Sequence, residues 1–131
     1  MILLGDIGGT NVRFATLHAD GRIDRFESWL TALYPNIAGA VKAYAEATGA
    51  RLPFQAAAMC AAGPLTGDHI DLTNCGWKIS VGEIAAATGA RAPVLVNDFA
   101  AVARALPALG AGDLVRVGGG EPLEGAPKVA L

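Results

Sequence analysis

Two short stretches of this chain combine residue types that can bind a ligand, and the first is Asp6 followed by Gly8, Gly9, Thr10 and Asn11. The glycines leave backbone N–H groups bare, and the threonine and asparagine add side-chain donors, so the turn can hold phosphate oxygens. A carboxylate tolerates such a neighbour when a cation lies between them, and Mg²⁺ is the usual cation. The alternative is a plain hairpin turn with Asp6 as a turn-capping carboxylate.

The second stretch is Asn97-Asp98, which directly follows the apolar run 93–96 and opens an amphipathic segment over 99–106. In open α/β sheets, ligands bind beyond the carboxyl ends of the strands. A helix N-terminus also favours an ionised carboxylate. The pair is therefore a candidate for ligand binding, and the alternative is that it only caps the helix.

The first stretch must be positioned by a hairpin, because an apolar run at 2–4 precedes the Gly8-Gly9 turn and a strand resumes after it at 12–15. After an Asp20-Gly21 turn, residues 23–29 alternate apolar and polar side chains at a period of two, which predicts a third strand with one face in water. Three strands joined by tight turns form an antiparallel meander.

The second stretch must be positioned by the alternation of short strands and helices that follows the meander. Ser80 and Glu83 have the spacing of a capping box, which predicts where one of these helices begins. The α/β fold class expected is a mixed sheet in which the meander is followed by βαβ units. Helices are predicted from 35 to 48, 81 to 88 and 99 to 106, and strands at 56–61, 69–74, 93–96 and 114–117, with another beginning at 129–131.

Composition excludes several other classes of protein. The chain has 131 residues, enough for one domain, and a formal net charge of -2 with no basic cluster, so a nucleic-acid partner is not expected. No apolar run approaches the ~18 residues of a membrane span, and the start lacks a signal peptide, so a cytoplasmic protein is expected. Cys60 and Cys75 are expected to be small buried residues in apolar strands, and His18 a surface residue without an acidic neighbour.

The combined pattern resembles the bacterial glucokinase family, in the superfamily that also holds hexokinase and actin. Four motifs in chain order carry this resemblance along essentially the whole chain. They are Gly5-Asp6-Ile7-Gly8-Gly9-Thr10-Asn11-Val12-Arg13, then Thr73-Asn74 with Trp77, then Val96-Asn97-Asp98-Phe99, then Gly118-Gly119-Gly120-Glu121-Pro122 with Gly125 and Pro127.

The resemblance implies a ribonuclease H-like first domain of an ATP-dependent glucose kinase that uses Mg²⁺ and is a homodimer when full length. It implies that Asp98 is the catalytic base, that Asn97 and Asp98 bind the sugar, and that Asp6 holds the metal. The loop at Gly63-Pro64 and the segment near Trp77 would border the sugar. The nucleotide-binding residues implied are Gly5, Asp6, Ile7, Gly8, Gly9, Thr10 and Asn11.

The resemblance also implies that residues 1–131 are the small N-terminal domain, and that a second phosphate loop and a Glu-x-x-His pair would follow Leu131. These residues alone are therefore expected to be inactive and to self-associate. Two alternatives stay open: a kinase for another hexose or an amino sugar, and a non-catalytic nucleotide-binding module. Asn11 and Phe99 favour glucokinase over the related repressor and kinase group. ADP or polyphosphate in place of ATP also stays open.

Overall fold

The computed structural model describes residues 1–121, 123 and 125–127, so the strand expected at 129–131 and Pro122 of the last motif lie outside the described residues. The chain divides into two compact units, Met1–Asp98 and Phe99–Leu131. Among the described residues, no helix is both long and apolar enough to cross a membrane. The two units are described separately.

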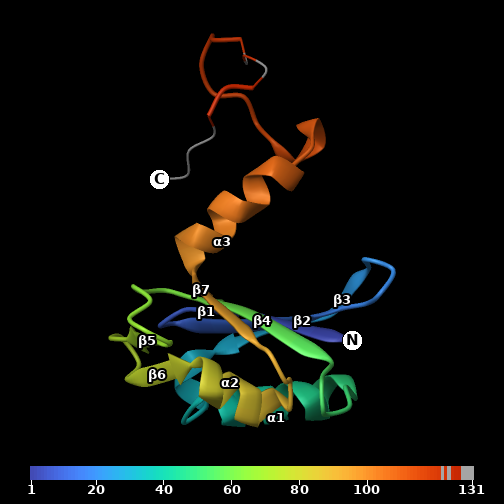
Figure 1. Ribbon diagram of the computed structural model, residues 1–131, viewed down its shortest axis with the longest axis vertical. Helices are drawn as coiled ribbons and strands as arrows, with labels where there is room; N and C mark the ends of the chain where they lie inside the picture. Colours follow the sequence, from blue (N-terminus) through green and yellow to red (C-terminus); the bar gives the residue numbers. More distant parts are fainter. Residues whose placement is uncertain (122, 124, 128–131) are drawn as a thin grey trace. The chain divides into compact units, whose positions relative to one another are not determined.

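The first unit is built on a five-stranded sheet in the order β3-β2-β1-β4-β7 (Figure 1). The first three strands form the predicted antiparallel meander, whereas β4 and β7 run parallel to β1. The mixed α/β sheet expected from the sequence is thereby confirmed. The strands are β1 (Ile2–Ile7), β2 (Asn11–Leu17), β3 (Ile23–Leu30), β4 (Ala56–Ala61) and β7 (Val94–Asn97).

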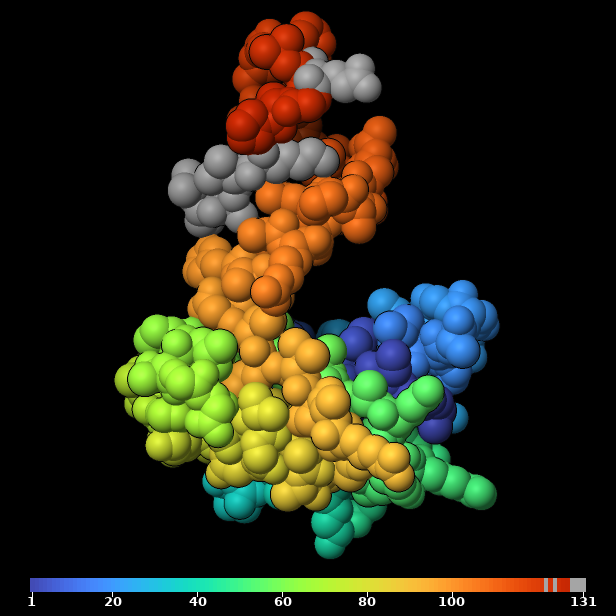
Figure 2. Space-filling view, in the orientation of Figure 1, coloured from blue at the N-terminus to red at the C-terminus, as the bar shows by residue number. Residues whose placement is uncertain are grey.

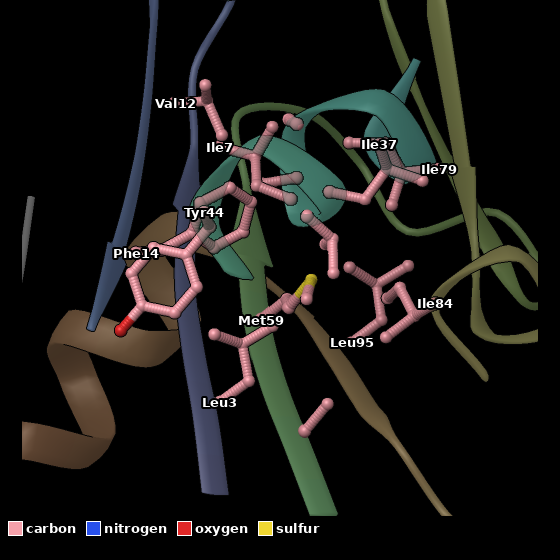
Figure 3. Close-up of a cluster of buried hydrophobic side chains, with 14 of the residues drawn as sticks. Leu3, Ile7, Val12, Phe14, Ile37, Tyr44, Met59, Ile79, Ile84 and Leu95 are labelled. Atoms are coloured by element: carbon pink, nitrogen blue, oxygen red, sulfur yellow. The ribbon is translucent and has the colours of Figure 1, made fainter. Parts of the chain in front are cut away.

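One face of this sheet packs against helices α1 (Ile37–Thr48) and α2 (Val81–Thr88) and the hairpin of β5 (His69–Leu72) and β6 (Trp77–Ser80). Alternate residues of β1 and β4 are buried, as expected for a sheet with one covered face. Figure 3 shows the buried side chains converging between these layers. They include Leu3, Ile7, Val12, Phe14, Ile37, Tyr44, Met59, Ile79, Ile84 and Leu95.

Each of the two covering helices begins after a residue whose side chain caps it. Ser80 and Glu83 form the predicted capping box at the start of α2. Helix α1 begins at Ile37 rather than at Pro35, because the Asn36 side chain accepts a hydrogen bond from the Gly39 N–H at 3.0 Å and acts as the N-cap. The prediction that Pro35 lies in the first turn was therefore wrong.

The hairpin of β5 and β6 was only half predicted. The strand expected over residues 69–74 ends at Leu72, because the chain turns through residues 73–76 and returns as β6. Trp77 begins β6 with its side chain 5% exposed. Its indole Nε1 donates to the Tyr34 carbonyl at 3.2 Å, which satisfies the buried donor.

Strand β3 is an edge of the sheet, and it departs from the predicted one-sided pattern. Its register shifts between Phe14 and Thr16 of β2, and Arg25 adopts a left-handed φ of 53°. Phe26 and Leu30 are 65% and 53% exposed. The period-two alternation therefore does not bury one face of β3, because the bulge changes which face of the sheet successive side chains occupy. In this strand, Trp29 is the residue that packs against the core.

The second unit contains most of helix α3 (Asp98–Ala105) and the short 3-10 helices η2 (Leu106–Ala108) and η3 (Ala111–Asp113). The predicted strand at 114–117 is absent from the described residues. Val115 and Val117 are instead almost fully exposed. A strand is stabilised by its ladder partner, and no described segment supplies one.

Tyr44 links the covering helix to the bulged edge. Its hydroxyl donates to the carbonyl of Arg25 at 2.9 Å, so the hydroxyl of Thr16, 2.8 Å away, is the donor to Tyr44. We expect Tyr44→Phe to lower the free energy of unfolding by about 1–3 kcal/mol, because it leaves two polar groups without their partner. Urea unfolding followed by circular dichroism would measure the loss.

Tyr34→Phe is the matched control, because the Tyr34 hydroxyl makes no hydrogen bond with any described residue. It should change the unfolding free energy by less than about 0.5 kcal/mol. Equal losses in the two variants would show that the hydrogen bonds of Tyr44 do not stabilise the bulge.

Candidate functional site

Three parallel strands end in one row at the carboxyl edge of the sheet. Ile7 of β1 pairs with Ala61 of β4, and Ala61 pairs with Asn97 of β7. Neighbouring strands lie about 4.8 Å apart, so the ends of β1 and β7 are separated by about 10 Å. The register therefore brings the glycine turn, the loop after β4 and Asp98 to the same edge.

The glycine turn is closed by a hydrogen bond from the N–H of Gly8 to the carbonyl of Asn11 at 2.8 Å. The expectation that the N–H groups of the turn are bare was therefore wrong for Gly8. The N–H groups of Gly9 and Thr10 donate to no described residue. A side chain on Gly9 would place its Cβ 2.8 Å from the Cβ of Asn74, so the turn packs closely against the Thr-Asn motif.

Asp6 lies on the sheet face opposite the helices, one residue before the end of β1. Its carboxylate accepts a hydrogen bond from Arg13 at 2.7 Å, and both side chains are nearly half exposed. The thiol of Cys60 lies 3.7 Å from its other oxygen.

The described residues supply no cluster of three metal-ligating side chains. Mg²⁺ usually keeps several waters and binds one or two carboxylates together with substrate phosphates. A partly exposed carboxylate beside the glycine turn fits that donor set, and Arg13 is the cation that neutralises it in this structure.

Cys60 is the residue of the site that the sequence interpretation missed. It pairs with Asp6 in the register and is half-buried. Burial, followed by the charge of Asp6, raises the pKa of the Cys60 thiol to about 11, and Asp98 adds to the effect. The signal was present, because Asp6 and Cys60 each come one residue before the end of a strand. Cys75 lies in the turn after β5 and not in a strand, which corrects that prediction.

Asn97 joins the end of β7 to the neighbouring loop. Its side-chain amide donates to the carbonyl of Gly63 at 2.8 Å and to the carboxylate of Asp98 at 2.9 Å. Asp98 is the first residue of α3, so the helix expected over 99–106 begins and ends one residue earlier, at Asp98–Ala105. Asn97 therefore holds two strand ends together, which a plain helix cap would not do.

Other residues singled out in the sequence lie elsewhere. The side chain of Trp77 is in the core, whereas Asn74 of the same motif lies against Gly9 at the carboxyl edge. His18 has an acidic partner after all, because its Nε2 lies 2.9 Å from a carboxylate oxygen of Asp24. The β2–β3 hairpin brings these two residues together, although they are six positions apart in the sequence.

A cleft at the amino ends of β1 and β4 lies at the opposite edge of the sheet. It is lined by Met1, Gln55 and segments near Arg51 and Arg91. Figure 2 shows the two segments, green and yellow-orange, side by side. The cleft contains none of the predicted site residues.

A mixed sheet of this order, with a glycine turn after β1 and a carboxylate after β7, defines a domain of the actin and hexokinase type. The family model described as Glucokinase matches residues 3–131. The chain belongs to the glucokinase family.

Glucokinases from Pectobacterium atrosepticum and Chromobacterium violaceum are 37% and 42% identical to this chain over 127 and 125 residues. The alignments cover 96% and 95% of this chain but 39% and 36% of the relatives. The chain therefore spans about two fifths of the length of the curated relatives it matches.

Solved structures agree with this result. A glucokinase from an Antarctic psychrotroph has a TM-score of 0.77 at 32% identity, covering 94% of this chain and 40% of that chain. A glucokinase from Balamuthia mandrillaris, solved with glucose, shares the fold with a TM-score of 0.55 at 18% identity. It covers 74% of this chain and 29% of that chain.

The raised pKa of Cys60 predicts a slow reaction with alkylating reagents. At about pH 9 a thiol with a pKa of about 11 is only ~1% thiolate, and the thiolate is the nucleophile. Asp6→Asn removes the neighbouring negative charge, so the pKa should fall and the alkylation rate of Cys60 should rise several-fold. Mass spectrometry after timed exposure to iodoacetamide would measure it.

Cys75 is the internal control, and its rate should be the same in both proteins. Equal rates for Cys60 in both proteins would show that the Asp6 carboxylate does not act on the thiol.

Proposed function

We propose that the protein carrying this chain is a cytoplasmic, homodimeric kinase that transfers the γ-phosphoryl group of ATP to glucose and forms glucose 6-phosphate. Membership of the glucokinase family supports this proposal. The observation that carries it is the register that ends β1, β4 and β7 in one row, because it brings the glycine turn and the Asp98 carboxylate to the same edge.

The glycine turn is the proposed donor side of the site. Residues 5–11 hold the phosphates, with the unpaired N–H groups of Gly9 and Thr10 as donors and the hydroxyl of Thr10 beside them. Thr10 is exposed, so its hydroxyl is accessible to a ligand.

Asn97 and Asp98 are the proposed acceptor side. Asp98 accepts the proton of the 6-hydroxyl as that oxygen forms its bond to the γ-phosphorus and the bond to the leaving ADP breaks. Asn97 donates to the Asp98 carboxylate and so fixes the orientation of the base. Its second hydrogen bond, to the Gly63 carbonyl, holds both groups to the end of β4.

Asp6 is the proposed residue for the metal, through water. Asp6 would hold Mg²⁺ at this place, and the ion would supply charge neutralisation for the phosphate oxygens. Asp6 is suited to this role because it lies beside the turn on β1. Strand β4 lies between it and Asn97 of β7, so Asp6 is separated from the proposed sugar side.

The first test replaces Asp98. In the full-length protein, Asp98→Asn should lower kcat roughly a thousandfold, within the range of a lost general base, while glucose binding survives better because the amide still forms hydrogen bonds. Steady-state kinetics and calorimetric titration with glucose measure the two quantities. Asp20→Asn, at an exposed turn, is the control and should leave both unchanged. A near-normal kcat in Asp98→Asn would remove this residue from the base role.

The second test replaces Asp6. Asp6→Ala should weaken the use of MgATP and shift the Mg²⁺ dependence of the rate, while glucose affinity stays largely intact. Asp24→Ala is the control, because it also removes a carboxylate paired with an arginine, Arg22, but away from the turn. The assignment is wrong if glucose affinity falls and the Mg²⁺ dependence is unchanged. Loss of rate should be measured against a parent kcat of roughly 1 to 100 s⁻¹.

A further inference from the structure

Thr31 follows β3 directly, at the start of the 3-10 helix η1 (Thr31–Leu33), and its side chain is completely buried. Its hydroxyl donates to the carbonyl of Gly8 at 2.8 Å, and its backbone N–H donates to the carbonyl of Thr10 at 2.9 Å. One residue outside the glycine turn therefore holds two carbonyls within it.

These two hydrogen bonds decide where two N–H groups point, those of Gly9 and Asn11. The peptide bonds after Gly8 and Thr10 are trans, so the carbonyl and N–H of each peptide unit point in opposite directions. Because the two carbonyls point toward Thr31, the N–H groups of Gly9 and Asn11 point away from it. The carbonyls of Gly8 and Thr10 thus lie on the buried side of the turn, and the N–H groups of Gly9 and Asn11 lie on its other side.

Thr31 is itself held firmly by the core. The N–H of Tyr34 donates to the carbonyl of Thr31 at 3.1 Å, and the buried indole of Trp77 donates to the carbonyl of Tyr34 at 3.2 Å. The turn is therefore anchored, through η1, to strand β6. Asn74, in the turn before β6, packs against Gly9 from the same hairpin.

We propose that Thr31 is the positioning residue that orients the glycine turn for phosphate. This role rests on the proposed function of the turn and adds a residue that no motif in the sequence contains. Thr31 touches no ligand, because it is buried beneath the turn; it acts by keeping the carbonyl of Gly8 turned inward. Without the hydroxyl this buried carbonyl has no hydrogen-bond donor. The free-energy cost of the unpaired carbonyl then favours rotation of the peptide unit out of this orientation.

The test is Thr31→Val in the full-length protein. Valine has nearly the same shape, keeps the backbone bond to Thr10 and removes only the bond to Gly8. The dissociation constant for MgADP, measured by calorimetric titration, should rise about five- to tenfold, while that for glucose stays within about twofold. Thr31→Ser, which keeps the hydroxyl, should restore nucleotide binding to within about twofold of the parent.

Thr88→Val is the matched control. Thr88 is equally buried, and its hydroxyl also donates to a backbone carbonyl, that of Ile84 at 2.7 Å, but in α2. This control should lose stability and keep its MgADP affinity. Unchanged affinity in Thr31→Val, or equal losses in the Thr31 and Thr88 variants, would overturn the positioning role. Failure of the parent protein to bind MgADP would instead overturn the proposed function and the inference together.

Discussion

The pairing of β1, β4 and β7 in parallel is the constraint on which the rest of this structure depends. Parallel neighbours cannot be joined by tight turns, so each needs a crossover segment. Helix α1 lies in the first crossover, and the β5–β6 hairpin with α2 forms the second. The same segments supply the apolar side chains that bury one face of the sheet. Core packing and the alignment of the three strand ends therefore have one origin.

Much of the fold was predictable because it is encoded by neighbouring residues. The capping box of Ser80 and Glu83 depends on local signals and was predicted at the right place. The strand expected at 93–96 depends on them too, and it lies one residue further on, at Val94–Asn97. Strand β6 was missed because its apolar and polar side chains alternate over only four residues, Trp77–Ser80, and so short a run is a weak signal. The exposure of Phe26 likewise depends on a bulge that alternation does not reveal.

The candidate site divides in the same way. Asp6, the glycine turn and Asp98 were identifiable because each combines an unusual residue type with the end of a strand. Thr31 was not, since its importance comes from a hydrogen bond to Gly8, far away in the sequence. Cys60 offered only its place one residue before a strand end, and its contact with Asp6 depends on the strand register. In this chain, sequence patterns indicated the residues of the candidate site better than the residues that hold them in place.

The bulge in β3 has a consequence for how this edge of the sheet meets other molecules. A regular edge strand presents a continuous row of N–H and C=O groups on which a foreign strand can align. Here the left-handed Arg25 interrupts that row, and its carbonyl is turned back to the hydroxyl of Tyr44. The edge therefore offers two short segments in place of one long template, which protects it from amyloid-like strand addition despite its exposed apolar side chains.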